Sequence, residues 1–292
     1  MAEEITPEEK SELNYGAREV EVNQAIANVP EGELPLEGLP IEVAVSDIGS
    51  YENEQYALIR RGSFGASDVS VLLGVNPYKT VQELIHEKTL PYLTAEEKAI
   101  GEKSAVKKGR DLEPLIIEKF IKYFQLPTIK PEDMYRFKEY PFLTINFDGV
   151  TTTENGLIPV EVKVVTKFGM KKYNLSKSIF NEMLGFKELP LPMVNTNNSI
   201  QTKAGHYGIP PYYYCQLQQQ VTALNAPYGY LIALLEETWS FHVFMVWRDD
   251  AIFKDSVIQG YKAQQQIDLL KARNEHGQER PQESQESQTI QN

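Results

Sequence analysis

The chain has 292 residues, of which 41% are hydrophobic and 24% charged, a composition typical of a globular protein with a sizeable buried core. A single cysteine, Cys215, excludes an internal disulfide and any multi-cysteine metal site. No apolar run approaches the roughly 18 residues that a membrane span needs, so we expect no membrane partner. The opening residues, MAEEITPEEK, lack the regions of a signal peptide, so we expect a cytoplasmic protein.

The net charge of −12 is unevenly distributed along the chain. Residues 1–50 hold 12 acidic and 2 basic side chains, which leaves 29 acidic and 27 basic side chains for the remaining residues. Two stretches, Lys98–Arg110 and Val160–Lys187, are locally basic. Local rather than total charge decides whether a surface binds a phosphate backbone, so a nucleic-acid partner is compatible with this chain. The same lysines are compatible with an ordinary solvated surface.

Composition divides the chain into three parts. Residues 1–50 are acidic, and Val29–Pro40 is rich in Pro, Gly and Glu, which predicts a largely disordered arm. Residues 273–292 form a polar, low-complexity stretch that predicts a disordered tail. The one folded domain is therefore expected over residues 51–272.

The first clear helix is predicted over Arg110–Phe124. Its apolar residues, at positions 112, 115, 116, 120 and 123, follow the spacing of one helix face. Pro114 is tolerated only in the first turn of a helix, so Glu113 should lie near the helix N-terminus. A carboxylate there is either a partner of the helix dipole or a metal ligand.

A β-hairpin is predicted over Thr144–Val165, which is rich in Thr, Val and Ile. Asn155-Gly156 interrupts this segment and indicates a two-residue type I′ turn. Pro159 interrupts the second strand, and a bulge at that position would shift the pairing by one residue.

The predicted turn places charged residues on one face of the hairpin. It sets Val150 opposite Glu161 and Asp148 opposite Lys163, and opposed residues of paired strands share a face. Two carboxylates and one ammonium group are thus expected in a single patch. Glu161 and Lys163 alternate with valines, and charges within an apolar strand are costly unless they are paired or bound to metal.

This patch has the chemistry of a magnesium-dependent phosphodiesterase. Asp148 and Glu161 can supply the hard oxygen ligands that Mg²⁺ prefers, and the backbone carbonyl of Val162 could be a further ligand. Lys163 would orient the attacking water and stabilise charge on the phosphate. The alternative is a surface hairpin with a routine ion pair between Asp148 and Lys163.

The remaining segments contain a predicted substrate loop and a glutamine-rich helix. Thr166–Pro211 is longer than a simple connection, which favours a loop that contacts substrate. In the helix Tyr212–Leu224, Gln216 and Gln220 lie one turn apart, away from an apolar stripe. These amides suit contact with a phosphate or an attacking water, though a solvated helix face is also compatible.

Four blocks in this order resemble the YqaJ-type viral recombinase and lambda-exonuclease family, within the PD-(D/E)XK nuclease superfamily. Each block is weak alone, but four in the right order are specific, and together they span about 60% of the chain. They are RRGSFGASDVSVLLGVNPYKTVQELIHEKT at 60–89, KGRDLEPLIIEKF at 108–120, YPFLTINFDGV…GLIPVEVK at 140–163 and IPPYYYCQLQQQVTAL at 209–224.

The resemblance implies an α/β (α+β-type) fold with a restriction-endonuclease-like core, in which helices flank a mixed central sheet. It also implies roles for individual residues in the three later blocks. The implied metal-binding carboxylates are Glu113, Asp148 and Glu161. Lys163 is the implied catalytic lysine, and Gln216 is the implied active-site glutamine, with Gln218 as the competing choice.

In the first block, Arg60 and Ser67 match the residues that hold the phosphate of the DNA end in the family. Arginine suits bidentate phosphate contacts, and Ser67-Asp68 resembles a helix N-cap, which is a ready anion site. Arg61 and Ser63 are close substitutes. The alternatives are that Ser67 only caps its helix and that Arg60 or Arg61 is solvated.

The function that this resemblance implies is a Mg²⁺-dependent DNA exonuclease, with Mn²⁺ as a substitute metal. It would digest linear double-stranded DNA from its ends, 5′ to 3′, and generate single strands for phage-type recombination in a bacterium or a phage-infected host. A single-strand annealing protein and a homo-oligomeric ring, a trimer or a tetramer, are implied partners. The alternatives are an endonuclease or single-strand nuclease on the same fold, or a catalytically silent DNA-binding protein.

Overall fold

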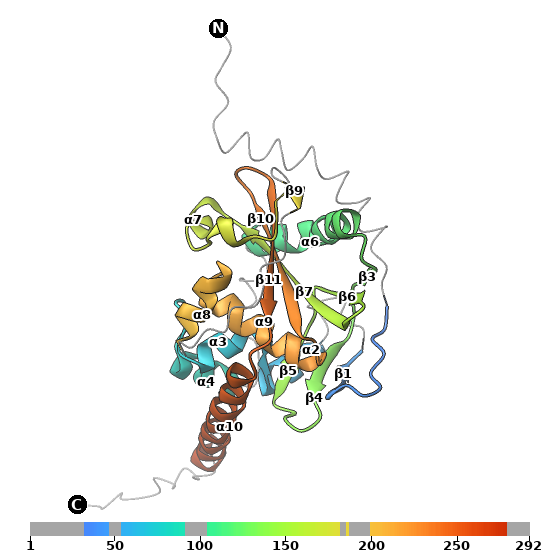
Figure 1. Cartoon of the computed structure of the whole chain (residues 1–292). Coiled ribbons are helices and arrows are strands. Elements are labelled where there is room, and N and C mark those ends of the chain that lie inside the picture. The colour runs from blue at the N-terminus through green and yellow to red at the C-terminus, as the bar shows by residue number, and fades with distance from the viewer. Residues whose placement is uncertain (1–31, 47–53, 91–103, 182–184, 187–198, 279–292) are drawn as a thin grey trace, which may run out of the picture.

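Two β-sheets contribute to one hydrophobic core (Figure 1). The computed structural model describes residues 32–46, 54–90, 104–181, 185–186 and 199–278. The larger sheet has seven strands in the order β3-β6-β7-β10-β11-β8-β9. Their bounds are Thr128–Ile129 (β3), Gly149–Thr153 (β6), Gly156–Val165 (β7), Tyr228–Leu235 (β10), Ser240–Trp247 (β11), Phe180–Asn181 (β8) and Gly185–Phe186 (β9). Strands β7 and β10 are parallel and the other neighbours are antiparallel, so the sheet is mixed, as predicted.

The smaller sheet has four strands in the order β1-β4-β5-β2. Their bounds are Ile41–Val45 (β1), Met134–Phe137 (β4), Leu143–Ile145 (β5) and Phe64–Gly65 (β2). Strand β1 lies within the predicted disordered arm, yet it pairs with β4, and the side chain of Ile41 is fully buried. The folded part therefore begins before residue 51. Residues 1–31 and 47–53 lie outside the described residues.

Helices cover both faces of the larger sheet (Figure 1). Their bounds are Glu54–Gly62 (α2), Val69–Leu72 (α3), Val81–Thr89 (α4), Ser104–Phe124 (α6), Lys167–Met170 (α7), Ile200–Tyr207 (α8), Pro211–Ala223 (α9) and Asp250–Gln278 (α10). Consecutive strand residues point to opposite faces. The ring of Tyr230 packs on Phe120 of α6, whereas its neighbour Gly229 lies against Leu217 of α9. Helices α6 and α9 therefore lie on opposite faces.

Helix α6 is longer than the sequence indicated. It begins at Ser104, so Pro114 and Glu113 lie within the helix rather than in its first turn. An internal proline costs a helix about 3 kcal/mol. The side chains of Leu112 and Ile116 beside it are fully buried, and this packing accounts for the tolerated break in the hydrogen-bond ladder.

The predicted register of the β6–β7 hairpin is wrong by two residues. Thr153 pairs with Gly156 and Val150 with Pro159, so the turn lies one residue earlier than expected. Within the hairpin only Gly156 has a positive φ, of 93°, whereas a type I′ turn needs two such residues. Side chains alternate with a period of two, so a slip of two leaves every residue on its predicted face.

Pro159 causes no bulge in the hairpin, since the β6–β7 pairing is regular through it. The pairing of β7 with β10 starts only at Val160, so Pro159 lies beyond the part of β7 that is paired on both sides. The missing N–H of the proline therefore leaves the parallel ladder intact.

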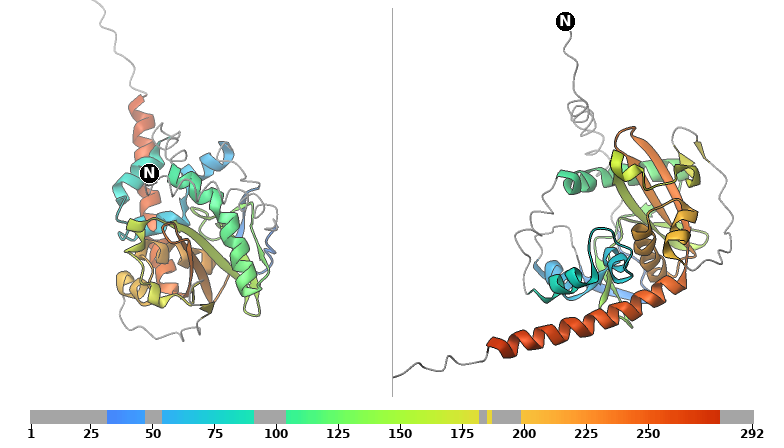
Figure 2. Two further views of the ribbon diagram at one scale, coloured as in Figure 1. Left: turned by 90° about the horizontal axis from the view of Figure 1, so that it is seen from above. Right: turned by 90° about the vertical axis from the view of Figure 1, so that its left-hand side faces the viewer.

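Two segments expected to lack regular structure contain helices and strands. The predicted substrate loop, 166–211, includes α7, β8, β9 and α8, while residues 182–184 and 187–198 lie outside the described part. Helix α10 continues past residue 272 into the predicted tail, to Gln278, and it extends well away from the body of the protein (Figure 2). No helix within the described residues is both long enough and apolar enough to span a membrane.

Candidate active site

The charged residues of β7 lie where this strand separates from β6. The β6–β7 pairing ends at Gly149 and Val160. Beyond it, the backbone N–H of Val162 donates to Oδ2 of Asp148 at 2.8 Å. A side chain thus replaces the neighbouring strand as the hydrogen-bond partner of β7. This separation leaves space for side chains next to Glu161 and its neighbours.

Glu161 and Lys163 form an ion pair on the α9 side of the sheet, and the ammonium group donates to Oε1 of the carboxylate. The side chain of Glu161 is 1% exposed and that of Lys163 is 22% exposed. The pair expected for a routine surface hairpin, between Asp148 and Lys163, is therefore wrong. Lys163 bonds to a buried carboxylate, and Asp148 is held by backbone.

Glu113 of α6 adds a third carboxylate to this region. Its Oε1 accepts a hydrogen bond from Nζ of Lys130 at 2.6 Å. Burial and the neighbouring charge of Asp148 raise the pKa of Glu113 to about 7, although Lys130 acts in the opposite direction. Glu113, Asp148 and Glu161 are called the carboxylate cluster below.

The carboxylate cluster carries more negative charge than its lysines neutralise. Burial and the charge of Asp148 raise the pKa of Glu161 to about 7, against the opposing effects of Lys163 and Gln220. Burial lowers the pKa of Lys163, but Glu161 and Asp148 outweigh it and raise that pKa well above its usual value. Three carboxylates thus share two ammonium groups, which are those of Lys130 and Lys163.

Two glutamines of α9 hold the carboxylate of Glu161. The amide of Gln216 donates to Oε1 at 2.5 Å, and that of Gln220 donates to Oε2 at 2.6 Å. Gln220 also donates to the backbone carbonyl of Asn146 at 3.1 Å, which ties α9 to the start of the hairpin. The interpretation of this face as solvated is wrong for Gln220, which is 1% exposed.

The spacing of Gln216 and Gln220 predicted two amides that contact a phosphate or an attacking water; in the structure both donate to the same carboxylate, as their separation of one helical turn allows. Gln218 points elsewhere. Its amide donates to the carbonyl of Trp247 at 2.9 Å, and its Oε1 accepts from the N–H of Asp249 at 2.7 Å. Of the two candidates for the active-site glutamine, the structure brings Gln216 to the carboxylate cluster.

The carboxylate cluster fits a divalent cation by its chemistry. As the side chains stand, no three His, Cys, Asp or Glu residues in the described ranges are arranged to hold a metal ion. Lysines and amides occupy the oxygens of Glu113 and Glu161 instead. Buried carboxylates in excess of their counter-ions are nevertheless the hard, negative donors that Mg²⁺ prefers. A bound cation would replace ammonium groups as the partner of these carboxylates.

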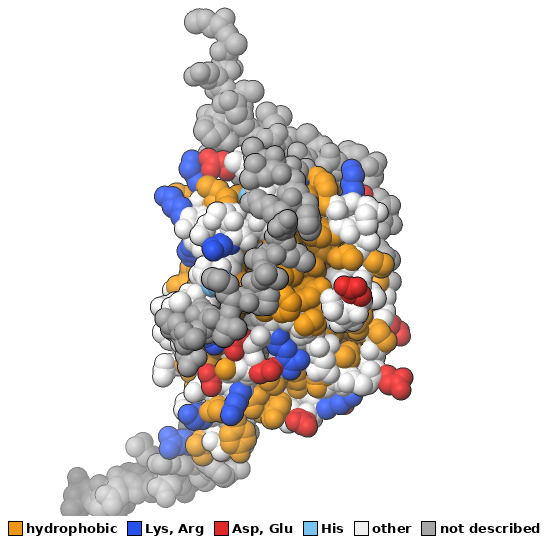
Figure 3. Space-filling view, viewed as in Figure 1, with side chains coloured by type: hydrophobic (Ala, Val, Ile, Leu, Met, Phe, Trp, Pro, Cys, Tyr) orange, Lys and Arg blue, Asp and Glu red, His pale blue; other side chains and the backbone are white. Residues whose placement is uncertain are grey.

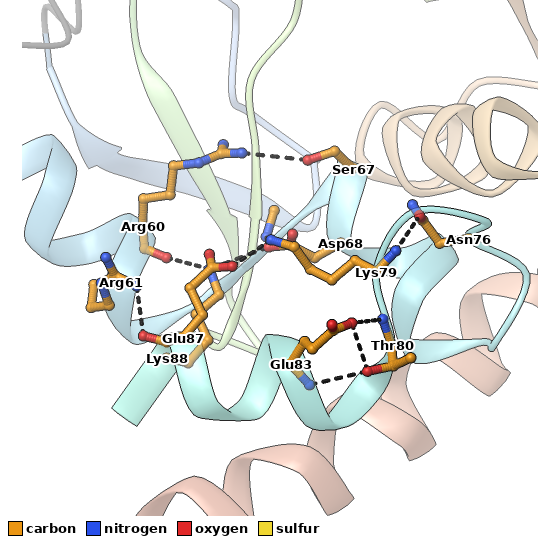
Figure 4. A network of polar contacts seen from close by, with 11 residues as sticks. Arg60, Arg61, Ser67, Asp68, Asn76, Lys79, Thr80, Glu83, Glu87 and Lys88 are labelled. Carbon is orange, nitrogen blue, oxygen red and sulfur yellow. Dashed lines mark hydrogen bonds and ion pairs between the residues drawn. The ribbon is translucent and has the colours of Figure 1, made fainter. Parts of the chain in front are cut away.

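A second group of polar residues joins α2, the 3-10 turn Ala66–Asp68 and α4 (Figure 4). The guanidinium of Arg60 donates to Oγ of Ser67 at 3.4 Å, so the structure brings together the two residues of the first block. A Cβ atom at Gly65 would lie 3.3 Å from Nη1 of Arg60, so the glycine leaves room for the guanidinium. Ser67 is exposed and caps no helix.

The N-cap of α3 is Asp68, but its carboxylate bonds elsewhere. It accepts from the N–H of Gly65 at 3.0 Å and lies 3.2 Å from Nζ of Lys88. Lys88 also donates to the backbone carbonyl of Arg60 at 2.7 Å. This buried ion pair fixes the backbone that carries Arg60, and the side chains of Ser67 and Asp68 make no capping hydrogen bond to α3.

The close substitutes for Arg60 and Ser67 have structural partners. Arg61 is 8% exposed, and its Nη1 donates to the carbonyl of Glu87 at 2.6 Å. Ser63 is 4% exposed; its hydroxyl donates to the carbonyl of Ile59 in α2 at 2.7 Å and lies 3.0 Å from the hydroxyl of Thr144 in β5. Both side chains hold α2 against its neighbours.

Solved structures of LHK-Exo share this fold at low sequence identity, and one further structure matches less well. The alkaline exonuclease LHK-Exo from Laribacter hongkongensis matches with a TM-score of 0.50 and 16% identity over 77% of this chain and 99% of that chain. The structure of LHK-Exo in complex with dAMP also has a TM-score of 0.50, with 15% identity over 76% and 98%. A phage-related exonuclease from Haemophilus somnus 129PT has a TM-score of 0.42 and 14% identity over 73% and 96%.

No curated protein matches the chain. A family model does match: that of the YqaJ-like viral recombinase domain, over residues 55–225. The matched stretch is more than half of the chain, and it contains the carboxylate cluster, Lys163, both glutamines that hold Glu161, and the contact between Arg60 and Ser67. The predicted resemblance is therefore confirmed, and the chain belongs to the YqaJ-like viral recombinase domain family.

Proposed function

We propose that the protein is a metal-dependent deoxyribonuclease that digests linear double-stranded DNA from its ends. The observation that carries the proposal is Glu161, a buried carboxylate held by Lys163 and two glutamines beside Asp148, within a YqaJ-like domain. A buried ionisable group is costly to keep without a function. The exonuclease folds of similar shape support the same reaction class.

Each residue has a role in this proposal. The carboxylate cluster and the Val162 carbonyl would hold Mg²⁺ or Mn²⁺, which when bound lowers the pKa of a water and shields the charge of the phosphate. Lys163 orients the attacking water and stabilises the charge that develops on the phosphate. Gln216 and Gln220 fix the position of Glu161. Asp148 is pre-positioned by its bond to Val162.

The biological setting follows from the family. We propose that a ring of three or four copies in the cytoplasm digests DNA from 5′ to 3′ and supplies single strands to an annealing protein during phage-type recombination.

Digestion of 5′-labelled linear, nicked and circular DNA, with and without Mg²⁺, tests the reaction. Linear DNA should be degraded only with metal. Cutting of closed circles would indicate an endonuclease, and no cutting at all would indicate a silent DNA-binding protein.

Removal of the 5′-phosphate from linear DNA is expected to slow digestion several-fold. Arg60 and Ser67 together offer a guanidinium and a hydroxyl to a terminal phosphate. Arg60→Ala should digest phosphorylated and dephosphorylated DNA at the same low rate. The measurement is the initial rate of nucleotide release from both substrates.

Arg136→Ala is the matched control, because Arg136 forms a half-exposed ion pair with Glu42 at the smaller sheet. It should keep the wild-type ratio between the two substrates. Equal wild-type rates on phosphorylated and dephosphorylated ends would remove Arg60 from this role.

Mg²⁺ is expected to raise the melting temperature more at about pH 8 than at about pH 5.5. Glu113 and Glu161 have pKa values of about 7, above the usual 4.5. Their contribution to stability is therefore present below pH 4.5 and is lost as the pH rises through 7, where both become charged. A bound cation relieves the repulsion between the charged carboxylates, and this repulsion arises only after Glu113 and Glu161 have lost their protons. Asp148→Asn should remove the Mg²⁺ effect, and a larger effect at the lower pH would contradict the assignment.

A further inference from the structure

Three tyrosines and a lysine form a continuous surface beside the candidate active site; Tyr78, Tyr212, Tyr213 and Lys172 are called the tyrosine patch below. The rings of Tyr212 and Tyr213 lie 4.4 Å apart, and those of Tyr78 and Tyr212 lie 5.9 Å apart in an edge arrangement. Nζ of Lys172 lies 4.5 Å from the ring centre of Tyr78 and 5.5 Å from that of Tyr212. The four side chains come from three separate segments of the chain.

The tyrosine patch begins at Lys163, the ion-pair partner of Glu161. Nζ of Lys163 lies 5.3 Å from the ring centre of Tyr213. Any phosphate close enough to contact Lys163 would therefore have an aromatic ring within one nucleotide of it. Tyr213 and Tyr212 stand in the first turn of α9, the helix whose amides hold Glu161.

A chain of hydrogen bonds links the tyrosine patch to the contact between Arg60 and Ser67. Ser70 donates to the carbonyl of Ser67 at 3.2 Å, and Asn76 donates to Oγ of Ser70 at 2.9 Å. Oδ1 of Asn76 then accepts from the N–H of Tyr78 at 2.8 Å. The loop that carries Tyr78 is thus fixed relative to Arg60.

Core packing does not explain Tyr78, because 71% of this residue is exposed. The basic surface around it suits a polyanion. Lys171 and Lys172 are exposed, Lys167 is exposed but pairs with Glu237 at 2.8 Å, and Lys and Arg side chains gather over α7 in Figure 3. An exposed aromatic ring with a lysine beside it is the arrangement by which proteins bind unpaired nucleotides without reading their sequence.

We propose that the tyrosine patch stacks the unpaired bases of the DNA end, with Tyr78 as the outer ring and Lys172 against the phosphates. This inference rests on the proposed function, since it assigns a ligand to the same site. A base has to leave its partner before its phosphate can reach a buried carboxylate, and stacking on tyrosine offsets that loss. Every base has an aromatic face, so digestion through any sequence is compatible with this surface.

The test compares two duplexes that differ only in the bases of a short 5′ overhang, which are normal in one and abasic in the other. Dissociation constants are measured for the full-length protein with Ca²⁺ in place of Mg²⁺ to prevent cleavage. The wild type should bind the abasic overhang at least about fivefold more weakly. Tyr78→Ala should bind both duplexes equally, whereas Tyr78→Phe, which keeps the ring, should preserve the difference.

Tyr261→Ala is the matched control, because Tyr261 is also an exposed tyrosine, on α10, with 57% exposure. It should retain the wild-type ratio. A wild-type ratio near one, or an unchanged ratio in Tyr78→Ala, overturns the inference. Because no cleavage is measured, a protein that binds but never cuts would refute the nuclease and leave the tyrosine patch standing.

A second measurement uses the wild-type protein alone. When 2-aminopurine is placed in the overhang, stacking on the tyrosine patch should quench its fluorescence upon binding. The fluorescence of a control duplex with 2-aminopurine at a paired internal position should change less. Bound overhangs that stay as bright as free DNA would overturn the inference.

Discussion

Lys163→Ala is expected to reduce DNA digestion by about 10²- to 10³-fold while Mg²⁺-dependent DNA binding persists. In the proposal Lys163 acts on the water and the phosphate, and its removal leaves the metal-binding oxygens in place. The loss should appear in kcat rather than in KM, because the interaction is strongest when charge develops in the transition state. Single-turnover digestion and DNA-binding titrations of the same preparation measure the two effects separately.

Asp148→Ala should lose both digestion and the binding of Mg²⁺, because it removes a metal ligand and also frees the N–H of Val162. Isothermal titration with Mg²⁺ distinguishes it from Lys163→Ala. Lys254→Ala, at an exposed position of α10, is the control and should digest DNA normally. Near-normal digestion by either Lys163→Ala or Asp148→Ala would refute the proposed active site.

Lys88→Met is expected to lower the free energy of unfolding by about 3 kcal/mol. The Lys88 and Asp68 side chains are only 4% and 11% exposed, so the substitution strands a buried carboxylate. Lys88 and Arg60 together lower the pKa of Asp68 in spite of its burial. That contribution is present above the unfolded pKa, near 3.8, and disappears as the pH falls through the lower folded value. Urea unfolding near neutral pH measures the loss.

Lys79→Met is the matched control in the same network (Figure 4). Lys79 pairs with Glu87, but the two side chains are 38% and 26% exposed, so the change should cost less than about 1 kcal/mol. The double variant Asp68→Asn with Lys88→Met should be more stable than the sum of the single losses predicts, since no charge is left unpaired. Equal losses for Lys88→Met and Lys79→Met would contradict this account.

The sequence predicted which faces the side chains of the β6–β7 hairpin occupy better than it predicted the pairing of the two strands. Alternation in strands has a period of two, so Asp148, Glu161 and Lys163 fall on one face in the predicted register and in the observed one. The predicted position of the turn was wrong because Asn155-Gly156 also suits a loop in which only Gly156 has a positive φ. Local turn chemistry alone does not distinguish these two registers.

The sequence alone did not predict which buried polar groups bond to one another. The ion pair of Lys88 with Asp68 joins residues from two helices, and the bond of Gln220 to Glu161 joins positions 59 residues apart. Such pairs depend on how the helices pack on the sheets, and no local sequence pattern predicts that packing. Strand β1 was missed for the same reason, because its pairing partner is β4, where Ile41 faces Phe137 far along the chain.

Helix α9 is anchored by amides on two sides, and this constrains how its sequence can vary. Gln218 and Gln219 bond to the backbone of Trp247 and Thr144, while Gln216 reaches Glu161. A slip of one residue along a helix axis is a movement of about 1.5 Å, and a misplacement of about 1 Å can cost an enzyme 10²-fold in rate. The acceptors for Gln218 and Gln219 are backbone carbonyls, which are present whatever side chains the strands carry, so no change in the strands can compensate for the loss of either amide. Only a side chain of the same reach with an N–H donor can take the place of these glutamines without letting α9 move.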